Sequence, residues 1–202
     1  MIGKDILQAI RPFVEALEEL GIAYYIGGSI ASSAMGIPRS TLDADIVADI
    51  DLEHVQPLVS LLQGEYYIVD SMMTDAIIRR TSFNIIYLKN SIKIDVFLPK
   101  KEAFDTSEFS RKQDILLGED DCARGFAIAS AEDTILRKLE WYKMGGGVSD
   151  RQWLDVLGLL KLKGSGLDIV YLTTWATDLG INNLLQQAMN DAGLQPEEDI
   201  EF

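Results

Sequence analysis

The sequence of 202 residues predicts an α/β (α+β) protein, in which a mixed β-sheet flanked by helices is followed by a small all-helical C-terminal domain. In the first hundred or so residues, stretches with helical apolar spacing alternate with short strand-like apolar runs. Two of those runs are separated by only three residues, which favours a β-hairpin. From Ala127 onward the apolar spacing is helical throughout.

The same observations predict the organisation of the chain. We expect a sheet domain over residues 1–110, a connector over 111–126, a helical domain over 127–195 and an acidic tail over 196–202. Hydrophobic residues make up 48% of the chain and charged residues 25%, which is typical of a globular protein and argues against disorder.

Composition also excludes several classes of function. With 18 basic and 32 acidic residues the net charge is −14, so general binding to duplex DNA is not expected. No apolar run is long enough to span a membrane, and the first residues lack the continuous apolar core of a secretion signal. The single cysteine, Cys122, fits a reducing compartment. We therefore expect a cytoplasmic protein that does not enter membranes.

The N-terminal part begins with a helix over residues 4–20, which Pro12 should kink or divide because proline lacks an N–H. After this helix we expect a strand over 22–26, a turn at Gly27-Gly28-Ser29, a helix over 30–35 and a strand over 42–47. The strand over 42–47 carries two carboxylates, Asp43 and Asp45.

The middle part alternates in the same way. We expect a helix over 51–63, a strand over 66–69, a helix over 71–80 and a hairpin of strands over 82–88 and 92–98. Asp51 is a candidate N-cap. The polar segment 100–124 is interpreted as the connection between the domains.

The C-terminal part is helical. Ser130 and Ser149 are candidate N-caps because each precedes an amphipathic run. The expected helices cover residues 130–144, 150–162, 168–179 and 182–192.

Three carboxylates indicate a divalent-metal site. Asp43 and Asp45 face the same way because they are two residues apart on a strand. Asp95 lies within the otherwise apolar strand 92–98 and is the best candidate for a third ligand. Carboxylate oxygens and substrate phosphates are typical ligands of Mg²⁺, and two such ions can assist an in-line phosphoryl displacement.

The glycine turn indicates a phosphate site close by. Gly27 and Gly28 allow backbone N–H groups to approach a phosphate. Ser29 would stand in the first turn of the next helix, where free N–H groups and the helix dipole favour an anion. Arg39, just before the acidic strand, could neutralise phosphate charge.

Taken together, Gly27-Gly28-Ser29, the segment Arg39–Asp45 (RSTLDAD) and Asp95 in IKIDVF resemble the DNA polymerase β-like nucleotidyltransferase superfamily. The chain looks most like its small bacterial AbiEii-like and minimal members. The resemblance implies a nucleotidyltransferase fold, binding of an NTP such as ATP by Gly28 and Ser29, and ligation of Mg²⁺ by Asp43 and Asp45. It implies that Asp95 is a metal ligand or general base, and that Lys138 contacts the triphosphate.

The resemblance further implies transfer of a nucleoside monophosphate to a hydroxyl acceptor with release of pyrophosphate. The acceptor could be a small cationic molecule, as in a resistance enzyme, a protein hydroxyl, as in a toxin–antitoxin pair, or a tRNA end. The alternative is a catalytically inactive module of the same fold that binds a nucleotide or a partner. Other conspicuous residues have plainer interpretations: Asp49 as a turn residue, His54 as structural, and Arg151 and Asp155 as an intrahelical ion pair. The plainer alternative for Lys138 is a surface lysine or a partner for Asp155.

Overall fold

The computed structural model describes residues 2–37, 41–118 and 123–194, and these residues form two compact units. The first unit comprises residues 2–34 and 41–129 and contains the β-sheet. The second comprises residues 35–37 and 130–194 and consists of helices and their connections. No helix among the described residues is long and apolar enough to cross a membrane.

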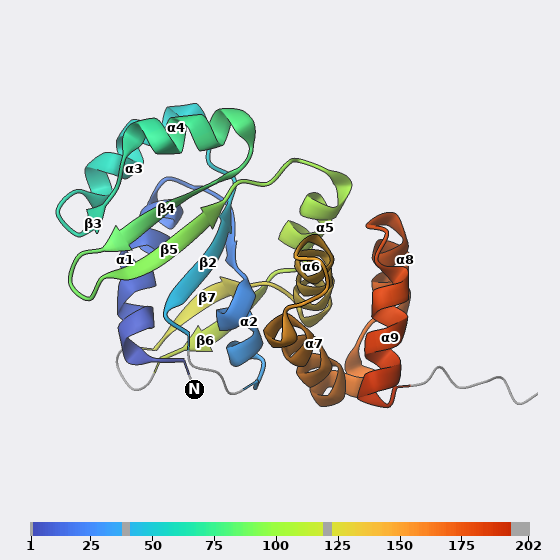
Figure 1. Ribbon diagram of the computed structural model, residues 1–202. Coiled ribbons are helices and arrows are strands. Elements are labelled where there is room, and N and C mark those ends of the chain that lie inside the picture. The colour runs from blue at the N-terminus through green and yellow to red at the C-terminus, as the bar shows by residue number, and fades with distance from the viewer. Residues whose placement is uncertain (1, 38–40, 119–122, 195–202) are drawn as a thin grey trace, which may run out of the picture. The chain divides into compact units, whose positions relative to one another are not determined.

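Within the described residues, seven strands form one mixed sheet in the order β3-β4-β5-β2-β1-β7-β6 (Figure 1). Two neighbouring pairs, β2 with β5 and β1 with β7, are parallel, and the other pairs are antiparallel. The strands are β1 (Tyr24–Ile26), β2 (Asp43–Ala48), β3 (Tyr66–Tyr67), β4 (Ser82–Tyr87), β5 (Ile92–Phe97), β6 (Gln113–Leu117) and β7 (Arg124–Ile128). The predicted mixed sheet with flanking helices is confirmed.

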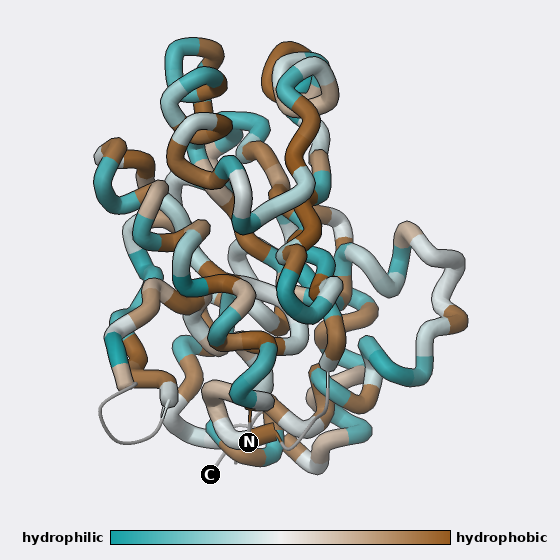
Figure 2. Tube along the Cα trace, turned by 90° about the vertical axis from the view of Figure 1, so that its left-hand side faces the viewer, coloured by the Kyte–Doolittle hydropathy of each residue, from teal (hydrophilic) through white to brown (hydrophobic). Residues whose placement is uncertain are grey.

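One face of this sheet is buried and the other is partly open. On β2, Ala44 and Ile46 are fully buried, whereas the alternate residues are half-buried or exposed. The buried face is the one against helix α1 (Lys4–Glu19), because Tyr24 shares a register with Ala48 and its hydroxyl donates to Glu18 of α1 at 2.8 Å. The alternation of apolar and polar residues along the chain can be followed in Figure 2.

The other helices of the first unit are short. They are α2 (Gly28–Ala34), α3 (Val55–Leu62) with the 3₁₀ turn η1 (Leu52–His54) before it, α4 (Asp70–Arg79) and α5 (Ala103–Arg111). Helix α2 begins at Gly28, directly after β1 and Gly27. Gly28 and Ser29 therefore belong to the first turn of α2 itself.

Helix α1 passes through Pro12 without ending, so the second helix, one of the two outcomes that the sequence predicted at Pro12, does not form. The tyrosine at position 66 explains how the helix accommodates the proline. Its hydroxyl donates to the carbonyl of Ala9 at 2.6 Å and accepts from the N–H of Phe13 at 3.1 Å. Tyr66 thus bridges a backbone donor and acceptor that would bond each other in a regular helix.

The segment predicted as a connector contains regular structure. Helix α5 and strand β6 lie within it, and β6 pairs with β7 at the edge of the sheet. Most residues of β6 are exposed or half-buried, so its sequence lacks the strict apolar alternation that reveals a strand with one covered face.

The second unit contains α6 (Ala131–Met144), α7 (Asp150–Lys163), the 3₁₀ turn η3 (Gly164–Gly166), α8 (Ile169–Asp178) and α9 (Asn182–Ala192). Ser130 and Ser149 cap α6 and α7 as predicted, accepting bonds from the N–H groups of Asp133 and Gln152. Residues 35–37 belong to this unit because the Ile37 side chain lies against Gly158 of α7.

Candidate active site

The three carboxylates singled out in the sequence lie together on the open face of the sheet. Strands β2 and β5 are parallel neighbours, and Asp45 is in register with Asp95. Asp43 precedes Asp45 by two residues and therefore faces the same way. The Asp95 side chain is 24% exposed, so its carboxylate is accessible to solvent although its backbone is part of β5.

A lysine that sequence reasoning did not select lies among them. Lys93 is in register with Asp43, and its Nζ lies 2.7 Å from Oδ2 of Asp95. The hydrogen bond to Asp95 raises the pKa of Lys93, with the charges of Asp95, Asp43 and Asp45 adding to it against the opposing effect of burial. The sequence did contain one indication of this placement, because Lys93 precedes Asp95 by two residues on a predicted strand and therefore faces the same way.

The glycine turn adjoins Asp45 directly. Gly28 has a φ of +54°, and a Cβ placed on it would lie 2.7 Å from Cγ of Asp45. Any side chain at this position would therefore collide with the carboxylate. Glycine at position 28 joins the turn to the acidic strand, which explains why the two motifs occur together.

The neighbouring glycine has a different role from the one expected. The N–H of Gly27 donates to the backbone carbonyl of Asp45 at 2.9 Å and so continues the β1–β2 pairing. It points into the sheet, which leaves Gly28 and Ser29 as the candidate phosphate contacts of the turn. Ser29 lies in the first turn of α2 and is 9% exposed. Arg39 lies outside the described residues.

The residue types suit a magnesium ion, because carboxylate oxygens are ligands that Mg²⁺ prefers and three carboxylates face the same side of the sheet beside a helix start. Within residues 2–37, 41–118 and 123–194, no three His, Cys, Asp or Glu side chains are close enough together to share one metal ion. The ammonium group of Lys93 contacts Asp95 in this arrangement.

Lys138, predicted to contact a triphosphate, belongs to the second unit. It is 5% exposed, and its Nζ lies 2.7 Å from Oδ2 of Asp155 and 3.3 Å from Oε1 of Gln152. The pairing crosses from α6 to α7 and is one of the two that the sequence offered for Asp155, the other being an intrahelical pair with Arg151. Lys138 is therefore a buried cation with carboxylate and amide partners.

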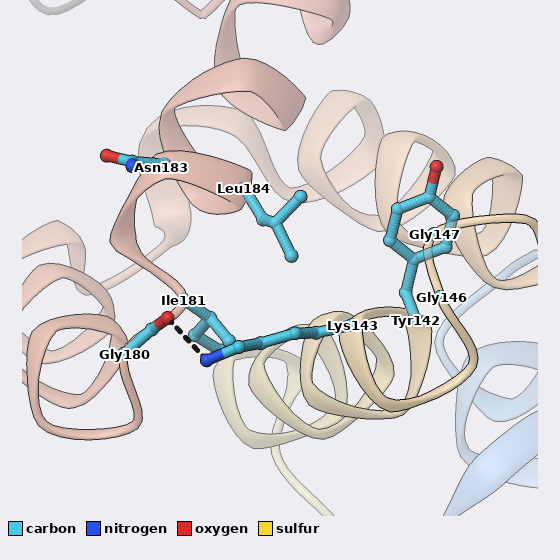
Figure 3. A pocket seen from close by; sticks show the side chains of 8 residues that line it. All are labelled: Tyr142, Lys143, Gly146, Gly147, Gly180, Ile181, Asn183 and Leu184. Carbon is cyan, nitrogen blue, oxygen red and sulfur yellow. Dashed lines mark hydrogen bonds between the residues drawn. The ribbon is translucent and has the colours of Figure 1, made fainter.

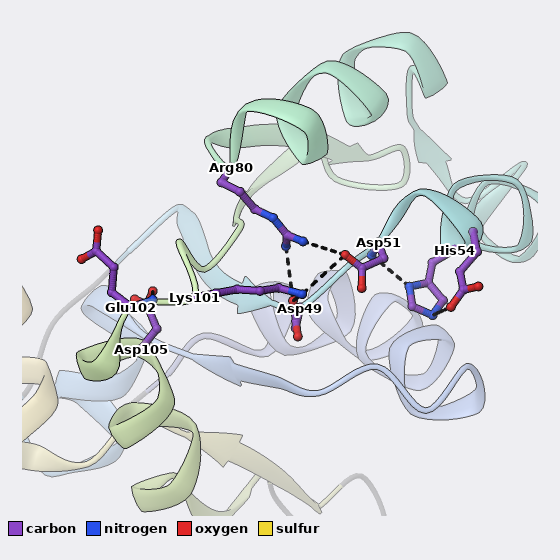
Figure 4. A network of polar contacts seen from close by, with 8 residues as sticks. Asp49, Asp51, His54, Arg80, Lys101, Glu102 and Asp105 are labelled. Atoms are coloured by element: carbon purple, nitrogen blue, oxygen red, sulfur yellow. Dashed lines mark hydrogen bonds and ion pairs between the residues drawn. The ribbon is translucent and has the colours of Figure 1, made fainter.

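A second polar group of the first unit involves Asp49 and Asp51, which follow β2 (Figure 4). Arg80 contacts both carboxylates, at 3.3 and 2.7 Å, and Lys101 lies 3.5 and 3.7 Å from them. The hydrogen bond from Arg80 lowers the pKa of Asp51, with smaller contributions from the charges of Lys101, Arg80 and His54.

His54 completes this group as a structural residue. Its Nδ1 accepts from the N–H of Asp51 at 3.0 Å, within the cap that begins η1. Asp51 is thus a cap residue as predicted, and these contacts hold together the loops that follow β2, α4 and β5.

The second unit also carries an open depression, shown in Figure 3. The Nζ of Lys143 donates to the carbonyl of Gly180 at 2.9 Å at its edge. The lining residues are Tyr142, Lys143, Gly146, Gly147, Gly180, Ile181, Asn183 and Leu184. Of the residues predicted to bind nucleotide or metal that the structure describes, none lines it.

Comparison with known proteins identifies the fold. No protein-family model matches the chain, and no curated protein matches it. Among solved structures, the antibiotic-resistance factor ANT(2'')-Ia superposes with a TM-score of 0.57 at 13% identity, over 91% of this chain and 97% of that one. The same factor in complex with adenylyl-2''-tobramycin gives a TM-score of 0.54 at 14% identity, over 87% and 99%.

A further structure extends the likeness. An antigenic nucleotidyltransferase-like protein from Paracoccidioides brasiliensis superposes with a TM-score of 0.54 at 15% identity, over 94% of both chains. The nucleotidyltransferase fold predicted from the sequence is therefore confirmed. The finer placement in the AbiEii-like branch stays a prediction.

Proposed function

We propose that this protein is a Mg²⁺-dependent nucleotidyltransferase, which moves a nucleoside monophosphate from an NTP to a hydroxyl acceptor and releases pyrophosphate. The observation that carries the proposal is the register of Asp45 with Asp95 on the open face, with Gly28 directly against Asp45. Carboxylates for a metal and a helix start for a phosphate are thereby neighbours in a nucleotidyltransferase fold.

The reaction assigns a role to each group. Gly28 and Ser29 hold the phosphates through the first turn of α2. The acceptor oxygen attacks the α-phosphorus, the bond from that phosphorus to the bridging oxygen breaks, and pyrophosphate leaves. Asp95 accepts the proton of the acceptor hydroxyl as general base.

Asp43, Asp45 and Asp95 would hold the Mg²⁺ ions. When bound, Mg²⁺ neutralises the charge that develops on the phosphoryl oxygens. Arg39 and Lys138 are proposed as further phosphate contacts. For Lys138 this requires its ammonium group to exchange contacts with Asp155 and Gln152 for a phosphate oxygen.

Among the acceptors, we favour a small cationic molecule that carries hydroxyl groups. The net charge of −14 attracts cations and opposes a polyanion such as tRNA. The structure of ANT(2'')-Ia with adenylyl-2''-tobramycin supports this preference, because the fold there holds an adenylylated aminoglycoside. A protein hydroxyl, as in a toxin–antitoxin pair, is the second acceptor to test.

The test is incubation with Mg²⁺ and each NTP labelled at the α-phosphate, together with an aminoglycoside panel, cell protein or tRNA. We expect the label in the small-molecule fraction and release of one pyrophosphate per transfer. Asp45→Asn should lower the rate by about 100-fold or more, because charge stabilisation of several kcal/mol is lost.

Asp114→Asn, at an exposed position of β6, is the matched control and should leave the rate unchanged. Binding of ATP without any transfer would contradict the enzyme and favour the inactive nucleotide-binding module.

A further inference from the structure

Three carboxylates bring like charges together on the open face of the sheet. Asp45 and Asp95 are directly opposite each other on β2 and β5, and like charges in that relation destabilise a sheet. Asp43 adds a third negative charge two residues away on β2. On its other side Asp95 is in register with Asn84 of β4, which carries no charge.

Lys93 supplies a positive charge beside Asp95 in this arrangement. It is on the same face as the three carboxylates because it precedes Asp95 by two residues. Its Nζ lies 2.7 Å from Oδ2 of Asp95, and its side chain is 44% exposed. A side chain that open to solvent can leave Asp95 without disturbing the buried face of the sheet, where Ile94 and Val96 lie.

A divalent cation would neutralise the same carboxylates. Two cations that require the same oxygen compete for it, and the stronger competitor displaces the other. We propose that Lys93 is a positioning residue, which holds Asp95 and balances the carboxylates until a divalent cation displaces its ammonium group. This inference rests on the proposed function in one respect, the role of Asp95 as a metal ligand.

The test measures metal binding and needs no turnover. Mn²⁺ is titrated into the nucleotide-free protein and followed by calorimetry and by the electron paramagnetic resonance signal of free Mn²⁺. Lys93→Met should bind Mn²⁺ about tenfold more tightly than the wild type, because the competing charge is gone. Lys93→Arg keeps the charge and should bind within about twofold of the wild type.

Lys89→Met is the matched control for net charge. Lys89 lies in the turn between β4 and β5, is 71% exposed and contacts Glu65 at 3.5 Å, so its removal should leave Mn²⁺ affinity unchanged. Folding is checked by thermal unfolding. In EDTA Lys93→Met should melt below the wild type, and added Mn²⁺ should raise its melting temperature by more than it raises that of the wild type.

Equal or weaker Mn²⁺ binding by Lys93→Met would overturn the proposal, as would an absence of Mn²⁺ binding in both proteins. A failure of the proposed function is distinguishable, because it would show as no transfer of labelled nucleotide by the wild type whatever the Mn²⁺ affinities are.

Discussion

Gly28 lies against the carboxylate of Asp45, so one residue without a side chain decides whether the glycine turn and the acidic strand can adjoin. Its positive φ alone would favour glycine, but the nearby carboxylate makes the requirement stricter. The positive φ affects stability, whereas the contact with Asp45 affects activity, so mutations can separate the two effects.

Gly28→Ala should abolish nucleotidyl transfer, because the new methyl group displaces the Asp45 side chain. The backbone strain alone should cost about 1 kcal/mol of stability. Gly21→Ala is the control. Gly21 has a φ of +67° with nothing within 4 Å of the added Cβ, so this variant should lose similar stability and keep full activity. Comparable activity in the two variants would show that the contact with Asp45 is unimportant.

At the scale of elements, the hydroxyl of Tyr66 supplies hydrogen-bond partners to backbone groups of helix α1 next to Pro12. Tyr66→Phe should destabilise the protein by about 2 kcal/mol, because a buried backbone donor and acceptor lose their partner. Urea unfolding measures this cost.

The same substitution made together with Pro12→Ala should cost less than about 1 kcal/mol, since the N–H of Phe13 can then bond the carbonyl of Ala9 directly. An equal cost of Tyr66→Phe in both backgrounds would mean that the hydroxyl does not compensate for the proline.

The contacts of Arg80 with Asp49 and Asp51 make the free energy of unfolding depend on pH. The pKa of Asp51 is lower in the folded protein than in the unfolded chain. Its contribution is therefore complete above the unfolded value of about 3.9 and is lost as the pH falls through the folded value.

Arg80→Met should thus lower the free energy of unfolding by up to about 1 kcal/mol at pH 7, a small effect because the carboxylates are partly exposed. In urea titrations the two proteins should converge as the pH falls below the folded pKa of Asp51. A difference that stays constant while the carboxylates are protonated would assign the effect to packing of the arginine stem.

At the scale of the whole molecule, the local patterns predicted the sheet, its flanking helices and the helical C-terminal part. The two-residue period of a strand also predicted that Asp43 and Asp45 face the same way, and Asp95 was the candidate for a third carboxylate on a neighbouring strand. The pairing of β2 with β5 was needed to bring those residues together, and pairing partners are not visible in a local pattern.

The features that were missed depend on distant partners. The N–H of Gly27 bonds to Asp45 because of the β1–β2 register, so the residue type alone could not exclude it as a phosphate donor. The sequence offered two partners for Asp155, Arg151 and Lys138, and helical spacing alone could not decide for the contact between α6 and α7 that the structure shows. Strand β6 was not predicted from the sequence, because an exposed edge strand lacks apolar alternation.

The parallel pairing of β1 with β7 bears on how the chain can be shortened. Ile26 is in register with Ile128, and the N–H of Ala129 donates to the carbonyl of Ile26, immediately before the glycine turn. A fragment ending at residue 110 would keep every predicted carboxylate yet leave β1 as a bare sheet edge, open to association with other chains. A truncation meant to isolate the sheet domain should therefore retain the chain through residue 129.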